Sequence, residues 1–259
     1  MRSDNWAPES LNWICPYCGA GQLKLDASHL LRKEYEYSKE KNRNCEFEDC
    51  LGESCCTGIL KCDNNVCGEL VSFCGTGRDE IFEADEPKSP SGTVPVYCHI
   101  ITPLFVHPSP HFIKMSSNYP QTVTVHLKES FGLFWVDKMS CANKLRVVVE
   151  DVLNHFGVKR TCIIKKKHKR QNLTTHARLD KFEKMPKFSE PAKYLLAIKW
   201  IGNAGSHTGR FDDKVLVKGF SLIEKALDIL FLKNDEELRK TCKLINRTNG
   251  RVHSTKLPF

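Results

Sequence analysis

Apolar residues between Pro120 and Gly157 recur at steps of three and four positions, which is the spacing of one face of an α-helix. Pro120 suits the first turn of a helix, and Gly157 is a typical C-terminal stop. We therefore predict one long amphipathic helix over this stretch. Its buried face would contain Phe134, Cys141, Leu145, Val148, Val149, Val152 and Phe156.

Further helical patterns follow along the chain. A short helix should end before Pro186, and a stronger one should begin at Ser189. Asp212 or Asp213 can cap the last long helix, and residues 236–245 should add a short one. Together these patterns predict an antiparallel bundle of four to five helices.

The N-terminal part has a different pattern. Residues 70–73 and 94–101 are rich in β-branched and aromatic side chains, which favour strands. Residues 84–93 form a polar, proline-containing break between them. Pro103 and the prolines that follow it at 108 and 110 are expected to prevent a long regular element there.

Cysteines are frequent and clustered. The chain has 13, and eight of them lie between Cys15 and Cys67. Two pairs, Cys15 with Cys18 and Cys62 with Cys67, are closely spaced, and glycine follows the second cysteine of each. Because zinc prefers four thiolates in a tetrahedron, these four are predicted to hold one structural zinc in a zinc ribbon.

Four more cysteines lie between the two pairs, at positions 45, 50, 55 and 56. Cys45, Cys50 and Cys55 could bind a second metal, or the segment could be a loop with free thiols. A metal or redox sensor is a further alternative for this insert.

These patterns predict a mainly α fold, in which an antiparallel helical bundle follows a small N-terminal β zinc ribbon. The zinc ribbon with its acidic, cysteine-rich insert would span residues 1–83. A linker with a β-like segment would span 84–118, the helical domain 119–246 and a tail 247–259.

The net charge of +8 is unevenly distributed. Residues 26–86 hold 15 acidic and 7 basic side chains, so the remainder of the chain is strongly basic. Residues 159–170 contain seven Lys or Arg and no acidic residue. This arm could bind phosphates or could be a solvated loop. The candidate nucleic-acid contacts in it are Lys165, Lys166, Lys167, Lys169 and Arg170.

One segment combines several reactive side chains at helical spacing. Lys199, Asn203 and His207 are four residues apart and would share one helix face. A histidine can transfer protons near neutral pH, and a lysine can stabilise developing negative charge. The alternative is a helix end that Gly202 and Gly205 allow to pack tightly.

Other functional classes lack support in the sequence. There is no Gly-rich phosphate loop, dinucleotide-binding fingerprint or nucleophile elbow. No segment has the ~20 apolar residues of a membrane span, and the N-terminus lacks an apolar signal core. We therefore expect a cytoplasmic protein whose thiols stay reduced.

The chain resembles the bacterial DUF4145 family, which is grouped with the HEPN superfamily. The resemblance lies in Cys-Pro-x-Cys-Gly at the start, in residues 143–150, and above all in residues 197–207, Ala-Ile-Lys-Trp-Ile-Gly-Asn-Ala-Gly-Ser-His. It implies a HEPN-like fold for the bundle. HEPN proteins include metal-independent RNases of phage-defence and toxin–antitoxin systems, and they usually act as homodimers.

The resemblance also implies roles for individual residues. His207 would be the acid/base or 2′-hydroxyl-activating group, and Asn203 its polar partner. The family motif has an arginine directly before the polar residue, where this chain has Gly202. The positive charge would then come from Lys199, Arg146 or Arg210.

Two functions follow as hypotheses. The first is a nucleic-acid-binding or -cleaving protein, with RNA expected rather than DNA, that acts as a metal-independent RNase effector. The second is a non-catalytic binding or dimerisation module that docks nucleic acid or a partner protein of a defence or restriction system.

Overall fold

The computed structural model describes residues 3–6, 13–43, 51–85, 93–164, 169–205, 213–232 and 247. The chain divides into two compact units, which we describe separately. The β unit comprises Met1–Lys114 together with Lys128–Cys141. The helical unit comprises Met115–Leu127 together with Ala142–Phe259.

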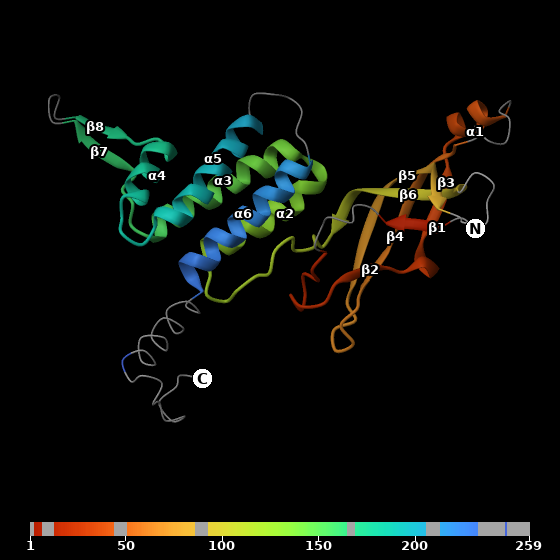
Figure 1. The fold of residues 1–259 in the computed structure, drawn as a ribbon, viewed down its shortest axis with the longest axis horizontal. Helices are drawn as coiled ribbons and strands as arrows, with labels where there is room; N and C mark the ends of the chain where they lie inside the picture. Colours follow the sequence, from red (N-terminus) through yellow and green to blue (C-terminus); the bar gives the residue numbers. More distant parts are fainter. Residues whose placement is uncertain are drawn as a thin grey trace. The chain divides into compact units, whose positions relative to one another are not determined.

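A curled six-stranded sheet forms most of the β unit (Figure 1). Its order is β1-β6-β5-β4-β2, with β3 also paired to β4. β1 runs parallel to β6, and all other pairs are antiparallel. The strands are β1 (Ser3–Trp6), β2 (Leu23–Leu25), β3 (Leu31–Glu34), β4 (Glu53–Cys62), β5 (Leu70–Asp85) and β6 (Thr93–His107). A 3-10 turn, η1 (Ala27–His29), and a short helix, α1 (Glu36–Asn42), lie between β2 and β4.

This sheet shows that the predicted mainly α fold is wrong, and the protein is mixed α/β. Strands β5 and β6 are 16 and 15 residues long, whereas the sequence indicated only short strands at 70–73 and 94–101. Pro103 does not end β6, because it lies opposite Gly75 where the register shifts. A bulge tolerates proline, which has no N–H to donate to the neighbouring strand.

The core of the β unit combines alternate strand residues with an aromatic cluster. Every second side chain at each end of β4 is buried, as expected for a sheet with one covered face. The aromatic cluster joins Trp13 to Trp135, with ring centroids 4.9 Å apart, and Phe112 to Phe134, at 4.7 Å. These contacts hold the segment that precedes Cys15 against the rest of the unit.

Helices dominate the second half of the chain (Figure 1). They are α2 (Gln121–Val136), α3 (Lys138–His155), α4 (Thr175–Glu183), α5 (Ser189–Gly205) and α6 (Asp213–Phe231). The single long helix predicted from Pro120 to Gly157 is two helices, because Asp137 interrupts it. The Asp137 carboxylate accepts hydrogen bonds from the N–H groups of Met139 and Ser140, which caps the start of α3.

The predicted apolar stripes form the core of the helical unit. On α3, Leu145, Val148, Val149 and Val152 are fully buried. The stripes of α5 and α6 are buried as well, at Leu195, Ile198, Leu216, Phe220, Ile223 and Leu227. The described ends of the basic segment, for which a phosphate-binding arm and a solvated loop were both open, pair as antiparallel strands β7 (Thr161–Ile164) and β8 (Lys169–Asn172). The helix predicted at 236–245 lies outside the described residues.

Within the described ranges, no helix is both long and apolar enough to cross a membrane.

Candidate functional site

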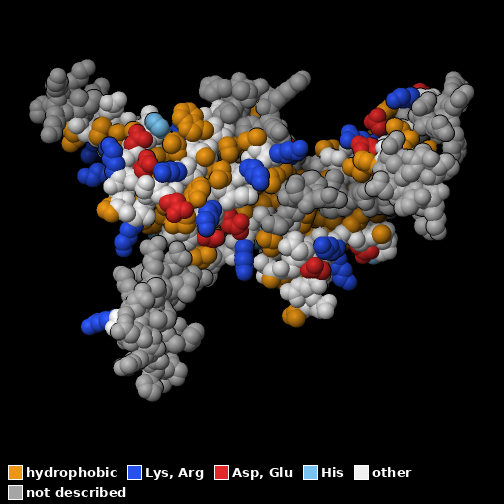
Figure 2. Space-filling view, in the orientation of Figure 1, with side chains coloured by type: hydrophobic (Ala, Val, Ile, Leu, Met, Phe, Trp, Pro, Cys, Tyr) orange, Lys and Arg blue, Asp and Glu red, His pale blue; other side chains and the backbone are white. Residues whose placement is uncertain are grey.

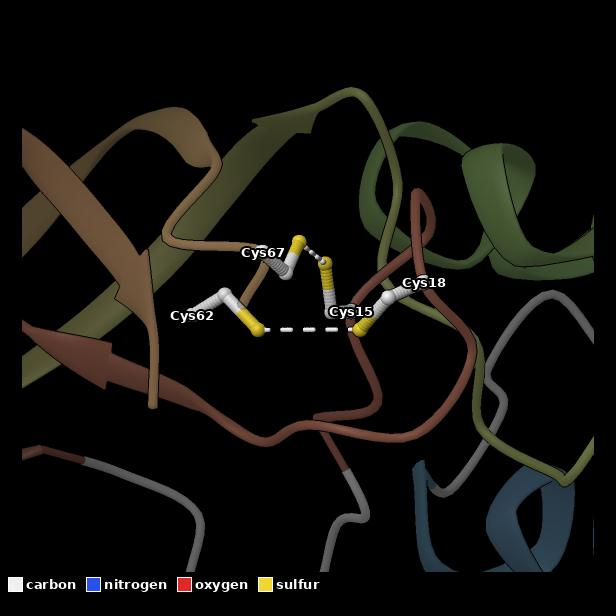
Figure 3. A group of neighbouring side chains, drawn as sticks. All are labelled: Cys15, Cys18, Cys62 and Cys67. Atoms are coloured by element: carbon white, nitrogen blue, oxygen red, sulfur yellow. Dashed lines mark hydrogen bonds between the residues drawn. The ribbon is translucent and has the colours of Figure 1, made fainter. Parts of the chain in front are cut away.

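The four cysteines chosen from the sequence converge in the β unit. Cys15 and Cys18 lie on one loop, Cys62 ends β4, and Cys67 lies in the turn before β5 (Figure 3). Their sulfur atoms all lie within 4.8 Å of one another. Two of these distances, Cys15 to Cys67 and Cys18 to Cys62, are 3.8 Å. The cluster is therefore a possible metal site, as the spacing predicted.

The first pair sits in a tight turn. The Cys15 N–H donates to the Gly21 carbonyl at 2.8 Å, and the Gly19 N–H donates to the Cys15 carbonyl at 2.9 Å. Gly19 has a φ of +65°, which a residue with a side chain adopts only at a cost. The Gly21 N–H donates to the Cys18 sulfur at 3.3 Å. The turn thus directs the Cys18 thiol toward the middle of the four sulfurs and places the Gly21 N–H against it.

The second pair sits in a similar turn. The N–H groups of Cys67 and Gly68 both donate to the Asn64 carbonyl at 2.9 Å, and Gly68 has a φ of +59°. Asp63 joins the two turns, because its carboxylate accepts from the Gln22 N–H at 2.7 Å and its own N–H donates to the Gln22 carbonyl. The four sulfur positions are therefore fixed by main-chain hydrogen bonds.

The spacing of the sulfurs fits a tetrahedral ion. Four sulfurs at about 2.3 Å from a central metal lie about 3.8 Å from one another, which is the separation of both hydrogen-bonded pairs. Gly21 is part of this fit. A Cβ atom at position 21 would lie only 2.4 Å from the Cys62 sulfur and 2.8 Å from the Asn64 Cβ. Only glycine leaves room for the fourth thiol.

Cys18 and Cys62 differ strongly in pKa without a metal. N–H groups of Gly21 and Ala20 lower the pKa of Cys18 to about 6. Burial raises the pKa of Cys62 to about 12, because the thiolate would lose its contact with water. A bound divalent cation supplies the charge that stabilises all four thiolates at neutral pH. The donor set therefore suits a cation and is poorly matched to four free thiols.

The two insert cysteines that the structure describes do not join this cluster. Cys55 and Cys56 lie next to each other on β4 and face opposite sides of the sheet, with Cys55 exposed and Cys56 buried. Adjacent strand residues facing opposite sides cannot bind one ion together. Cys45 and Cys50 lie outside the described residues.

The second predicted site lies in the helical unit, and only part of it is described. Lys199 and Asn203 share one face of α5, with Lys199 only 8 % exposed and Asn203 half-buried. His207 and Arg210 lie outside the described residues. A Cβ atom at Gly202 would lie 2.9 Å from the Cβ of Arg146 and 3.0 Å from the Ala142 carbonyl. Gly202 therefore allows α3 and α5 to approach closely, with Arg146 of α3 directly against Gly202.

An exposed tryptophan on the same helix was not selected from the sequence. Trp200 is 53 % exposed. The Lys199 ammonium lies 3.3 Å from the centre of its ring, and the His176 ring lies 5.8 Å away. The helical spacing of residues 197–207 could have indicated that Trp200 is exposed, because it does not lie on the buried apolar face of α5.

The basic arm is described only in part. Lys165, Lys166 and Lys167 lie outside the described residues. Lys169 and Arg170 belong to β8, and Arg170 is exposed. The arm's role in binding nucleic acid stays a prediction.

Comparisons with known proteins find two domain families in this chain. A family model described as a domain of unknown function (DUF4145) matches residues 128–248, which supports the resemblance drawn from the sequence. A second model, a domain of unknown function (DUF8608), matches residues 7–106 and so includes all four clustered cysteines. No curated protein and no solved structure matches the chain. The relation to HEPN proteins stays a prediction.

Proposed function

We propose that this protein binds RNA through its helical unit and that a structural zinc ion at Cys15, Cys18, Cys62 and Cys67 holds its β unit folded. The observation that carries the RNA-binding role is the exposed Trp200 ring, with Lys199 against it and Asn203 on the same helix. An aromatic ring next to a cation is a typical platform for an unpaired base.

The charge pattern of the helical surface favours stacking over charge attraction. On the face drawn in Figure 2, Lys and Arg side chains over the helices are interspersed with Asp and Glu, and hydrophobic side chains lie exposed between them. A mixed surface of this kind gives weaker phosphate attraction than a continuous basic patch. Base stacking on Trp200 would then contribute much of the affinity.

The zinc assignment rests on the donor set. Four thiolates in a tetrahedral arrangement suit zinc better than calcium or magnesium, which prefer oxygen ligands. In a reducing compartment such as the cytoplasm these thiols would stay available for the ion. Bound zinc would supply positive charge at the centre, while the N–H groups of the two turns orient the thiolates.

Replacement of Trp200 by alanine is expected to weaken binding of a single-stranded RNA oligonucleotide by between about fivefold and about a hundredfold. Loss of one base–aromatic stack costs about 1–3 kcal/mol, and 1.4 kcal/mol corresponds to tenfold. Fluorescence anisotropy at two salt concentrations would measure this. Val125→Ala, which truncates an exposed side chain on α2, is the matched control. Equal affinity of both variants would contradict the stacking role, and no binding at low salt would favour the non-catalytic partner-docking module.

A second candidate function is metal-independent RNA cleavage by a homodimer. The observation that favours it is that Arg146 lies against Gly202, the position at which the family motif has its own arginine. Arg146 would stabilise the developing phosphate charge, and His207 would transfer the proton.

This activity predicts that RNA degradation by the purified protein persists in EDTA and is lost in His207→Ala. Denaturing gel electrophoresis of a labelled RNA would show the products. Arg146→Lys should retain part of the activity, because it keeps the charge without the guanidinium. Unchanged cleavage by His207→Ala would exclude this mechanism, while binding of RNA without turnover would leave the RNA-binding role in place.

A further inference from the structure

A second cluster of reactive side chains lies in the β unit, apart from the metal centre. It contains Ser54 and Cys56 from β4, Asp79 from β5 and His99 from β6. The sheet register brings them together: Asp79 pairs directly with His99, and Ser54 pairs with Gly77 on β5. Nothing in the sequence spacing joins these residues, because 43 positions separate Cys56 from His99.

The side chains form a chain of hydrogen bonds. His99 Nδ1 lies 2.7 Å from an Asp79 carboxylate oxygen, and His99 Nε2 lies 3.8 Å from the Cys56 sulfur. The Ser54 hydroxyl lies 3.2 Å from the same nitrogen and 3.5 Å from the sulfur. The other Asp79 oxygen accepts from the Gly52 N–H at 3.2 Å. The order is that of a nucleophile, a base and a residue that orients the base.

Gly77 makes this arrangement sterically possible. A Cβ atom there would lie 2.1 Å from His99 Nε2 and 2.8 Å from the Cys56 sulfur. Any other residue at this position would therefore displace the ring or the thiol. Gly77 thus lets the thiol and the imidazole approach each other across β5.

The direction of proton transfer follows from the partners of His99. The Asp79 carboxylate accepts the proton on Nδ1, so Nε2 is the basic nitrogen and points at the two possible donors. A thiol with an ordinary pKa near 8.5 gives up its proton far more readily than a serine hydroxyl. A thiolate–imidazolium pair can therefore form between Cys56 and His99. Both residues are at most 2 % exposed, and their attraction is strong where water is excluded.

Other titratable groups lie near Cys56 and His99. On β3, Arg32 is the cross-strand partner of Cys56 and Glu34 that of Ser54. Burial, and then the charges of Cys55 and Cys56, raise the pKa of the Tyr35 phenol, so it stays neutral at pH 7. The arginine favours a thiolate at Cys56 and the glutamate opposes it. His99 is therefore the group that determines whether the Cys56 thiol is ionised.

We propose that Cys56, His99 and Asp79 form a buried nucleophilic thiol site that reacts with small, uncharged hydroperoxides such as hydrogen peroxide. The Cys56 thiol passes its proton to His99 Nε2, and the thiolate attacks one peroxide oxygen. The S–O bond forms as the O–O bond breaks, and the departing hydroxide takes the proton from His99 to become water. Sulfur is oxidised to sulfenic acid and the peroxide is reduced.

Burial fits this class of reactant. Because Cys56 and His99 are buried, small uncharged molecules are the favoured reactants, and bulky thiols would reduce the sulfenic acid slowly. A metal fits less well, because only two strong donors, the Cys56 sulfur and His99 Nε2, face each other. Among the described residues, the four-cysteine cluster is the only group of three or more potential ligands brought together. This site stands independently of RNA binding.

The test uses the full-length, zinc-loaded protein and a small alkylating agent, chloroacetamide, with peptide mass spectrometry to follow each cysteine. Between pH 8.5 and pH 6, the alkylation rate of Cys56 should fall less than about threefold, because its thiolate persists. An ordinary thiol loses about a hundredfold over this range. Cys55, the exposed neighbour on the opposite face of β4, provides that comparison in the same molecule. For each cysteine, the rate at pH 6 is divided by its own rate at pH 8.5, so the different exposure of Cys55 and Cys56 does not affect the comparison.

Variants then separate catalysis from packing. His99→Gln should give Cys56 the steep profile of an ordinary thiol, and Asp79→Asn should move its midpoint to higher pH. In Ser54→Ala, the alkylation rate of Cys56 should remain nearly independent of pH. Cys55→Ser should not change the alkylation rate of Cys56 at any pH. A steep Cys56 profile in the unaltered protein would overturn the proposal without any variant, since that is the behaviour of a structural cysteine.

The peroxide step has its own readout. After brief exposure to hydrogen peroxide, the protein is denatured in the presence of dimedone so that the reagent reaches the buried sulfur. A dimedone adduct should appear at Cys56 and disappear in His99→Gln, with zinc content measured in parallel before denaturation. Adducts only at Cys15, Cys18, Cys62 or Cys67 would overturn the proposal, because they would show oxidation of the metal centre instead. Loss of RNA binding with intact Cys56 reactivity would contradict the proposed function alone.

Discussion

Replacement of Cys62 by serine is expected to abolish zinc binding and to unfold the β unit. Cys62 is 3 % exposed and ends β4, so its loss removes one of four ligands at the point where the two turns meet. Metal binding at a site of this kind contributes directly to folding. Structural zinc sites provide apparent binding free energies of about 10–16 kcal/mol, which exceeds the stability of most domains.

Elemental analysis and circular dichroism would measure this effect. The unaltered protein should carry one zinc per chain, and Cys62→Ser should carry none and lose strand signal. Cys74→Ser is the matched control, because Cys74 is an exposed cysteine on the neighbouring strand β5 and is not a member of the cluster. A Cys62→Ser protein with full strand content would show that packing alone holds the sheet.

Replacement of Gly21 by alanine should lower zinc affinity by at least about tenfold, although position 21 is not a ligand. The added Cβ would lie 2.4 Å from the Cys62 sulfur, which is inside any permitted contact, and the Asn64 backbone beneath it is fixed by the second turn. The sulfur or the loop must therefore move away from the tetrahedron. A site displaced by a few tenths of an ångström loses ligand geometry at all four sulfurs.

Gly19→Ala is the control for this prediction. Position 19 has a φ of +65° and nothing within 4 Å of a new Cβ, so alanine there should cost about 1 kcal/mol in backbone strain and leave the metal bound. Competition with a chromogenic chelator would rank the two variants. A larger loss of zinc affinity for Gly19→Ala than for Gly21→Ala would contradict the steric argument.

The metal cluster could be predicted because its signal is local. Each pair of cysteines lies within one turn, and glycine follows the second member of each pair. The spacing within each turn, and not the long insert between the turns, determines which sulfurs can share an ion. Gly21 could not be recognised in this way, because its neighbour Cys62 lies 41 positions further along the chain.

Helix positions were also largely predictable, whereas the sheet was not. The stripes of α3, α5 and α6 follow from the 3.6-residue period, which the chain carries over many turns. The break between α2 and α3 was missed, because Asp137 lies within a continuing pattern and its capping role depends on local geometry. Strands β5 and β6 were underestimated, since bulges accommodate the glycines and Pro103 that interrupt their pattern.

The DUF4145 segment illustrates a further limit. The sequence indicated Asn203, Lys199 and Arg146 as members of one site, and the structure places Arg146 next to Gly202 on the neighbouring helix. The exposure of Trp200 and its contact with Lys199 depend on packing around α5. Sequence motifs identified the segment, and packing identified the side chains available to a ligand.

The sequence by itself determined the four clustered cysteines and the buried faces of the helices, because both depend on residues within a few positions of each other. Tertiary structure decided the mixed α/β fold and the Cys56–His99–Asp79 cluster. These depend on which strands pair and in what register, and a shift by one residue would turn each of these side chains to the opposite face of the sheet. Such long-range pairing leaves little trace in local spacing.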